Sequence, residues 1–292
     1  MTTRCKIITA SDASAEDYLN QSLVKLLAER SMTEHRLVTR RLLRKHNVLF
    51  RAMTKSDGSV NGEKLRCASL ALDDLREDAR RGGISSLILL DRELLGTDSR
   101  ILRDCALFPQ TATNLTAFSH GWRSSETAIY ICISDYCDLF ARAHESLLVR
   151  RSWQPMGILQ RSAIADMPRR WPDLVREMRE AFPKSEIVMW QRRATTSVWS
   201  SVLGRILDTD PIPSDAIPKP RNDRLSHVEI LDLIEELSGR VDLDHYVDHR
   251  DKSFWMLDDY HPWSNHCQHR LAEAYSRDLE VVAAMDGIDF VG

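Results

Sequence analysis

Residues 4–17 read RCKIITASDASAED, and this stretch decides the fold. The run Cys5–Ala10 has the length and the nearly continuous hydrophobicity of a strand that is covered on both faces. Ser11–Asp17 then leads directly into a helix that we expect over Asp17–Ser31, with its leucines on one stripe. A buried strand that turns straight into a helix is typical of crossover connections between parallel strands, so the segment predicts an α/β protein.

The same alternation continues along the chain. Three further apolar runs of strand length lie at Ser86–Asp91, Ala128–Asp135 and Glu186–Trp190. Between these runs we expect helices over Gly62–Arg80, Tyr136–Arg151 and Trp171–Phe182. The pattern predicts a mainly parallel sheet flanked by helices on both faces.

Proline spacing suggests how the rest of the chain is organised. The segment Asp208–Arg221 holds four of the ten prolines and reads as an extended connector. We therefore expect an α/β core over residues 1–207, a proline-rich connector over 208–225 and a helical C-terminal arm over 226–292. Few strand signals occur in the arm, so it is expected to pack on the core within a single domain.

Composition narrows the class of protein. The 292 residues are 43% hydrophobic and carry a formal net charge of −3, which does not favour nucleic-acid binding. No apolar run approaches the roughly 20 residues of a membrane span, and no signal peptide is recognisable. The six cysteines include no C-x-x-C pair and are expected to be free thiols. These features predict a cytoplasmic protein.

The turn after the first strand is unusual for a phosphate-binding fold. Such turns carry glycines and a lysine, because backbone N–H groups must approach the phosphate and a cation must neutralise it. Here the turn contains neither, and it carries Asp12, Glu16 and Asp17 instead. Carboxylates suit the positive end of a helix dipole but repel a phosphate. A disabled phosphate loop is the expected consequence.

Several pieces of the chain, taken in order, resemble a known family. They are a strand and helix that end in YLNQSL, followed by LILLDRELLG, IYICISDYCDLFARAHESL, RRWPDLVREMREAFPKSEIVMWQRR and DDYHPWSNHCQHRLAEAYSRDL. Together they span about residues 7–279 and resemble bacterial sulfotransferases with a P-loop-like α/β fold. The resemblance implies a sulfuryl donor, 3′-phosphoadenosine 5′-phosphosulfate (PAPS), as the cofactor.

The resemblance also implies where the donor would bind. The family's loop, similar to G-x-x-K-T-[GA]-T-[TS], corresponds to residues 10–17, where Ala10 replaces the glycine and Ala13 the lysine. The family's strand-end arginine corresponds to Ser134, and its helical serine to Arg142. Ser11, Ser14, Ser134 and Arg142 are therefore the expected donor-contacting positions. With these cations missing, we expect weak or absent PAPS binding and no required cofactor.

Two residues are candidates for catalysis. Glu93 follows the second strand run at the edge that faces the ligand crevice in α/β sheets, and it is the candidate general base. The alternative is that Glu93 caps a turn or pairs with Arg92 or Arg100. His120 lies in a polar loop and is the second candidate, with simple surface exposure as the alternative.

Two other patterns favour structure over chemistry. His245 with His249, and His266 with His269, have helical spacing, but no H-E-x-x-H motif accompanies them, so we expect no metal site. Residues 36–51, RLVTRRLLRKHNVLFR, alternate basic and apolar residues and predict a basic amphipathic helix. A membrane surface or an acidic partner fits this helix, and a solvated surface helix is the commoner explanation.

Two functions fit these observations. The first is a sulfotransferase-like protein with weak or lost PAPS binding, which, if active, moves a sulfuryl group to a hydroxyl of a glycan or small molecule. The alternative is a non-catalytic binding protein on the same scaffold. Neither involves nucleic acid or a membrane span, and the sequence does not indicate an oligomeric state.

Overall fold

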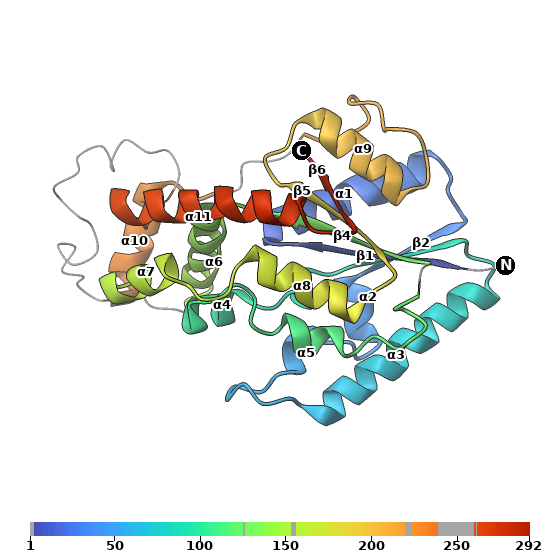
Figure 1. The fold of residues 1–292 in the computed structure, drawn as a ribbon, viewed down its shortest axis with the longest axis horizontal. Helices are drawn as coiled ribbons and strands as arrows, with labels where there is room; N and C mark the ends of the chain where they lie inside the picture. Colours follow the sequence, from blue (N-terminus) through green and yellow to red (C-terminus); the bar gives the residue numbers. More distant parts are fainter. Residues whose placement is uncertain (1–2, 125, 153–155, 220–223, 239–259, 261) are drawn as a thin grey trace.

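A single parallel sheet runs through the protein. The computed structural model describes residues 3–124, 126–152, 156–219, 224–238, 260 and 262–292 (Figure 1). Six strands pair in the order β2-β3-β1-β4-β5-β6, and every pair is parallel. The prediction of a mainly parallel α/β sheet is confirmed. The strands are β1 Arg4–Ala10, β2 His35–Thr39, β3 Ser86–Leu90, β4 Thr127–Ile133, β5 Glu186–Gln191 and β6 Ile288–Val291.

Helices cover both faces of the sheet, and several gather beyond the carboxyl ends of the strands, at the left of Figure 1. The predicted helices over 17–31, 62–80, 136–151 and 171–182 correspond to α1, α3, α6 and α8. The helices are α1 Ala13–Glu29, α2 Arg40–Lys45, α3 Gly62–Arg81, α4 Asp98–Asp104, α5 Thr111–Leu115, α6 Tyr136–Val149, α7 Ile158–Ala165, α8 Trp171–Ala181, α9 Thr196–Ile206, α10 His227–Ser238 and α11 Asn265–Ala283, with short 3-10 turns η1 Phe50–Ala52 and η2 Arg92–Leu94.

Successive residues of β1 supply two separate cores. Ile7 belongs to the larger core, which packs against α3, α6, α8 and α11, whereas Ile8 belongs to the core beneath α1 and α9. Neither isoleucine is exposed to solvent. Because side chains alternate between the faces of a strand, a strand covered on both faces must be apolar throughout. This explains why β1 reads as a continuous apolar run.

The basic segment 36–51 does not form one amphipathic helix, so that prediction is wrong. Residues His35–Thr39 form β2 at the edge of the sheet, paired with β3, and only Arg40–Lys45 is helical. An edge strand leaves part of its surface in water, so it tolerates arginine among its apolar residues. Only Val38 of β2 is fully buried. The basic residues therefore masked the strand pattern.

The C-terminal arm contributes a strand as well as helices. Helix α11 packs on α6, α7 and α8, and β6 then pairs with β5 at the other edge of the sheet. The sequence did not predict β6, because four residues are too few for a clear strand pattern. Its pairing ties the last residues of the chain to the sheet.

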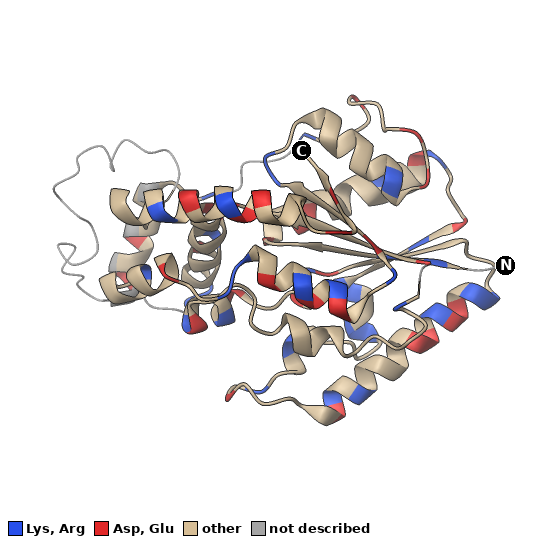
Figure 2. Ribbon diagram, in the orientation of Figure 1, with Lys and Arg blue, Asp and Glu red and all other residues tan. Residues whose placement is uncertain are grey.

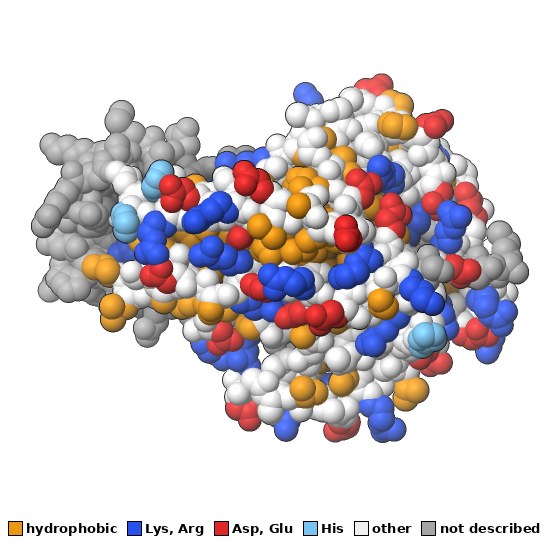
Figure 3. Space-filling model, viewed as in Figure 1, with side chains coloured by type: hydrophobic (Ala, Val, Ile, Leu, Met, Phe, Trp, Pro, Cys, Tyr) orange, Lys and Arg blue, Asp and Glu red, His pale blue; other side chains and the backbone are white. Residues whose placement is uncertain are grey.

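Charged residues lie mainly on the surface helices, while the strands are largely uncharged (Figure 2). On the face seen in Figure 3, acidic and basic side chains are mixed and border a narrow apolar strip. Within the described residues, no helix is both long enough and apolar enough to cross a membrane.

Gly204 provides a test of how the connector packs on α9. A Cβ at this position would lie 2.7 Å from the backbone oxygen of Asp210 and 3.0 Å from that of Thr209. Because backbone must move to relieve this overlap, Gly204→Ala is expected to destabilise the protein by roughly 1–3 kcal/mol. Thermal unfolding followed by circular dichroism measures the effect.

Gly62→Ala is the matched control. Gly62 begins α3, and a Cβ there meets no atom within 4 Å. Alanine favours the helix, so the melting temperature should stay the same or rise slightly. Equal melting temperatures for the two variants would show that the backbone of residues 209–210 does not pack closely against Gly204.

Candidate functional site

The topology creates a crevice between the carboxyl ends of β1 and β4. The connection after β1 runs toward β2 on one side, while the connection after β4 runs toward β5 on the other. Ligands in open α/β sheets bind at such a switch point. Ser11 and Ser134 follow the two strands, and the Ser11 hydroxyl donates to Ser134 Oγ at 2.9 Å. Two predicted donor-contacting residues therefore meet in this crevice.

Asp12 occupies the position in this crevice where an anion would be expected. It is the N-cap of α1, and its Oδ1 accepts a hydrogen bond from the backbone N–H of Ala15 at 2.9 Å. Its Oδ2 accepts a hydrogen bond from Ser134 at 2.8 Å and pairs with Arg192 Nε at 3.5 Å. The carboxylate is buried, with 3% of the residue exposed. The carboxylate of Asp12 thus accepts hydrogen bonds from the helix N-terminus and from a hydroxyl, and it forms an ion pair with a guanidinium.

A second buried carboxylate, Asp138 on α6, gathers four arginines. Arg224 lies at 2.9 Å, Arg192 at 3.1 Å, Arg142 at 3.3 Å and Arg193 at 3.8 Å. Burial alone would raise the pKa of Asp138, yet the guanidiniums hold that pKa below its usual value. Arg192 also donates to Ser14 Oγ at 3.2 Å, which joins this cluster to the turn after β1.

The crevice contains a cavity of about 230 Å³, lined by Ser14, Arg142 and parts of α6. Ligand pockets commonly span roughly 300–1,000 Å³, so the hollow is small for a nucleotide. Arg92 also lines it, but its guanidinium is held in two hydrogen bonds to Asp98, at 2.9 Å and 2.6 Å. Of the expected donor-contacting residues, Ser134 and Arg142 contact the carboxylates of Asp12 and Asp138, Ser11 donates to Ser134, and Ser14 accepts from Arg192.

Glu93 lies in a different environment from the one predicted for a general base. Its carboxylate is 5% exposed and pairs with Arg40, with Arg44 at 3.4 Å and with Arg51 at 3.9 Å. Glu93 is not among the residues that line the crevice cavity. The carboxylate of Glu93 is therefore engaged in ion pairs. The sequence left ion pairing open as the alternative to catalysis, but with Arg92 or Arg100 as the partners. This arrangement argues against the general-base role.

His120 is exposed and lies away from the crevice. Its loop precedes β4 and therefore leads to the amino-terminal edge of the sheet, whereas the crevice lies at the carboxyl edge. This loop is attached to α3, because the Ser119 hydroxyl donates to Asp73 at 2.6 Å. The structure does not bring His120 together with Glu93 or the serines, and this supports the surface-exposure alternative.

The sequence did not single out Asp91 as a titratable group. This residue follows β3, is almost fully buried, and its carboxyl accepts a hydrogen bond from the backbone N–H of Glu93 at 2.8 Å. Burial, together with the nearby carboxylates of Glu16 and Glu93, raises the pKa of Asp91 to about 7. Glu16 in turn accepts from the backbone N–H of Arg92 at 3.0 Å. The position of Asp91 after an apolar run was visible in the sequence, but its burial was not.

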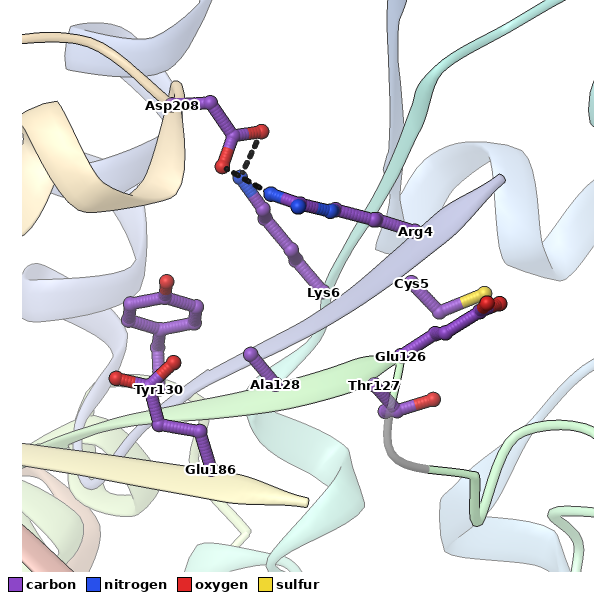
Figure 4. A pocket seen from close by; sticks show the side chains of 9 residues that line it. All are labelled: Arg4, Cys5, Lys6, Glu126, Thr127, Ala128, Tyr130, Glu186 and Asp208. Carbon is purple, nitrogen blue, oxygen red and sulfur yellow. Dashed lines mark hydrogen bonds and ion pairs between the residues drawn. The ribbon is translucent and has the colours of Figure 1, made fainter. Parts of the chain in front are cut away.

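Another cavity, of about 550 Å³, lies at the opposite, amino-terminal edge of the sheet (Figure 4). Lys6 lines this cavity. Its side chain is buried, and its ammonium nitrogen lies 2.6 Å from a carboxylate oxygen of Asp208. Lys6 also donates to the backbone oxygens of Arg205 and Ile206, at the end of α9. Lys6 thus caps the end of α9, so its ammonium group is used within the protein.

Histidines give no metal site in the part of the chain that the structure describes. His245 and His249 lie outside the described residues. His269 is exposed and pairs with Glu273 at 3.1 Å. Among the described residues, no group of three histidine, cysteine or acidic side chains is placed to hold a metal ion.

Comparison with known proteins adds no assignment. No family model matches the chain, and no curated protein matches it significantly. The geometry of the crevice is therefore the basis for any functional conclusion.

The raised pKa of Asp91 predicts a pH-dependent stability. The folded pKa of about 7 exceeds the ordinary value, so the stabilisation present at low pH is lost as pH rises from about 4 through 7. The loss is on the order of 4 kcal/mol at full ionisation. Asp91→Asn keeps an acceptor for the Glu93 N–H and cannot ionise. We expect its melting temperature to exceed that of the wild type by a margin that grows up to about pH 7 and is then constant.

Asp57→Asn is the control, because Asp57 is fully exposed. Its melting temperature should follow the wild type between pH 5 and 8. A margin for Asp91→Asn that does not change with pH would mean that Asp91 is ionised throughout.

Proposed function

We propose that this chain is a sulfotransferase-like protein whose donor site is closed by its own carboxylate, so that it binds PAPS weakly or not at all. The observation that carries the proposal is the position of Asp12. Its carboxylate accepts from the α1 N-terminus and from Ser134, and pairs with Arg192. These are the kinds of donors that an anion site offers to a phosphate.

The energetic argument has two parts. An incoming phosphate loses charge-assisted hydrogen bonds worth roughly 1.5–3 kcal/mol each, because Asp12 already accepts them. It also approaches a negative charge in a crevice where water screens poorly. Ala13 supplies no cation in the turn, and the nearby guanidinium of Arg192 is already paired with Asp12 and Asp138. The proposal therefore favours the non-catalytic alternative, a binding protein that keeps the scaffold.

A second candidate is an active enzyme that transfers a sulfuryl group to a glycan or small-molecule hydroxyl. Arg142 and Arg192 support it, because both reach the crevice beside Ser14. For donor binding, these arginines would have to exchange the carboxylates of Asp138 and Asp12 for phosphate oxygens. The two candidates thus differ in whether the Asp12 contacts open.

Calorimetric titration with 3′-phosphoadenosine 5′-phosphate, the desulfonated donor, tests the proposal. The wild type is expected to bind with a dissociation constant in the millimolar range or weaker. Asp12→Asn keeps a good N-cap and removes the charge, so we expect it to bind at least tenfold more tightly. Adding Ala13→Lys to this variant should increase the affinity further, because it supplies a cation in the same turn.

Asp17→Asn is the matched control. It removes the same charge, but from an exposed side chain that lies further along α1 than the Asp12 N-cap. Its affinity should change less than that of Asp12→Asn. Micromolar binding by the wild type would overturn the proposal, and equal gains for both variants would show that general charge, not the Asp12 contacts, closes the site.

A further inference from the structure

Three arginines converge on a single oxygen atom beside the carboxyl ends of β2 and β3. Arg40 and Arg44 come from α2, and Arg51 comes from η1. All three approach Oε1 of Glu93: Arg40 donates to it, Arg44 Nη2 lies at 3.4 Å and Arg51 Nη1 at 3.9 Å. We call Arg40, Arg44, Arg51 and Glu93 the α2 cluster.

Glu93 holds this cluster in a fixed place. Its backbone N–H donates to Asp91 at 2.8 Å, and its backbone oxygen accepts from the buried amide of Asn114 at 3.0 Å. The carboxylate is 5% exposed, so it cannot follow the arginines into solvent. A buried and anchored carboxylate therefore organises the guanidiniums before any ligand arrives.

The cluster has more donors than Glu93 can use. Each guanidinium carries five N–H donors, and only Arg40 and Arg44 donate hydrogen bonds to Glu93. Arg44 and Arg51 keep 41% and 52% of their side chains exposed. The Nε of Arg40 is buried and lacks an acceptor among the described residues.

Charge points the same way. The only other carboxylate paired with the cluster's arginines in the described chain is Glu16, which reaches Arg40 at 3.6 Å. Glu16 is itself buried and accepts a hydrogen bond from the backbone N–H of Arg92, so its carboxylate is also engaged away from Arg44 and Arg51. Exposed Arg41 and Lys45 on α2 add positive charge nearby. An excess of positive charge thus remains at Arg44 and Arg51.

The Asp138 cluster in the crevice is more enclosed. Arg192 is shared with Asp12 and Arg224 with Glu145, and the side chains of Arg142, Arg192 and Arg224 are at most 16% exposed. Its fourth arginine, Arg193, is 64% exposed and lies 3.8 Å from Asp138. The α2 cluster differs in presenting two well-exposed guanidiniums, those of Arg44 and Arg51, beside one carboxylate.

We propose that Arg40, Arg44 and Arg51 bind a tetrahedral oxyanion, as the phosphate or sulfate ester group of a ligand. Guanidiniums match the geometry of such groups through paired N–H donors, and three of them approaching from two elements suit an anion with several oxygens. Glu93 remains beneath as the fixed counter-charge. The proposal does not depend on the state of the donor crevice.

Titration of the full chain with inorganic phosphate and inorganic sulfate, at constant ionic strength set with sodium chloride, tests the site. Binding is followed by calorimetry and by the melting temperature. The wild type should bind both ions, and Arg44→Gln/Arg51→Gln should bind at least tenfold more weakly. Arg44→Lys/Arg51→Lys should fall between them, because lysine keeps the charge but not the paired donors.

Arg80→Gln/Arg81→Gln is the matched control. These two exposed arginines also share one carboxylate, that of Glu77, but lie on α3. This variant loses the same charge and should keep the wild-type affinity. A monosaccharide sulfate and a monosaccharide phosphate form a second arm: binding at least as tight as that of the inorganic ions indicates recognition of an ester group, and weaker binding indicates a free oxyanion.

Two results would overturn the proposal. One is a wild type whose affinity for phosphate and sulfate does not exceed its affinity for chloride. The other is an equal loss of affinity in the α2 and α3 double variants, which would reflect overall charge. Circular dichroism of each variant establishes that it is folded, and Arg44→Gln alone, which leaves two arginines on Glu93, provides a milder version of the same comparison.

Discussion

The cost of burying a carboxylate shapes the carboxyl edge of this sheet. Asp12, Asp138 and Glu93 are each nearly removed from water, and each is compensated by guanidiniums or by backbone N–H groups. An unpaired charge in such a place would destabilise the fold by several kcal/mol, so the partners are part of the structure itself. The edge where α/β proteins usually hold a ligand is thus occupied by internal ion pairs. That constraint explains why the hollow between β1 and β4 is small.

The compensation is not equal at the three carboxylates. Around Asp138, three of the four arginines are at most 16% exposed, and two of these are shared with Asp12 and Glu145. Glu93 gathers arginines from a short helix and a 3-10 turn, where two of them stay half exposed. The same residue types therefore produce a closed network on one side of β1 and an open cationic surface on the other. Position relative to the sheet, and not composition, makes the difference.

The sequence predicted the architecture well, because four of the strands are buried on both faces and read as continuous apolar runs. It missed β2 and β6 at the two edges, where solvent contact permits arginine and aspartate among few apolar residues. It also predicted that the Ser11–Ser14 turn, Ser134 and Glu93 meet, since all follow strand ends that a parallel sheet brings together. Ser11 and Ser134 do meet, whereas Glu93 pairs with the arginines of α2 and η1. The roles of Asp12 and Glu93 required coordinates, because the arginines that pair with them lie between 42 and 180 positions away in the chain.

The net charge of −3 also illustrates how little a whole-chain sum says about a binding surface. Electrostatic attraction acts over about a Debye length, roughly 8 Å at physiological salt, so an oxyanion near α2 responds mainly to the arginines there. Acidic residues elsewhere balance the total without reducing that local potential. The expectation that a chain of this charge does not bind nucleic acid rests on the lack of a broad basic face, whereas a single phosphate or sulfate group needs only a few fixed guanidiniums. A protein can therefore close its crevice to a large polyanion and still present a site for a small one.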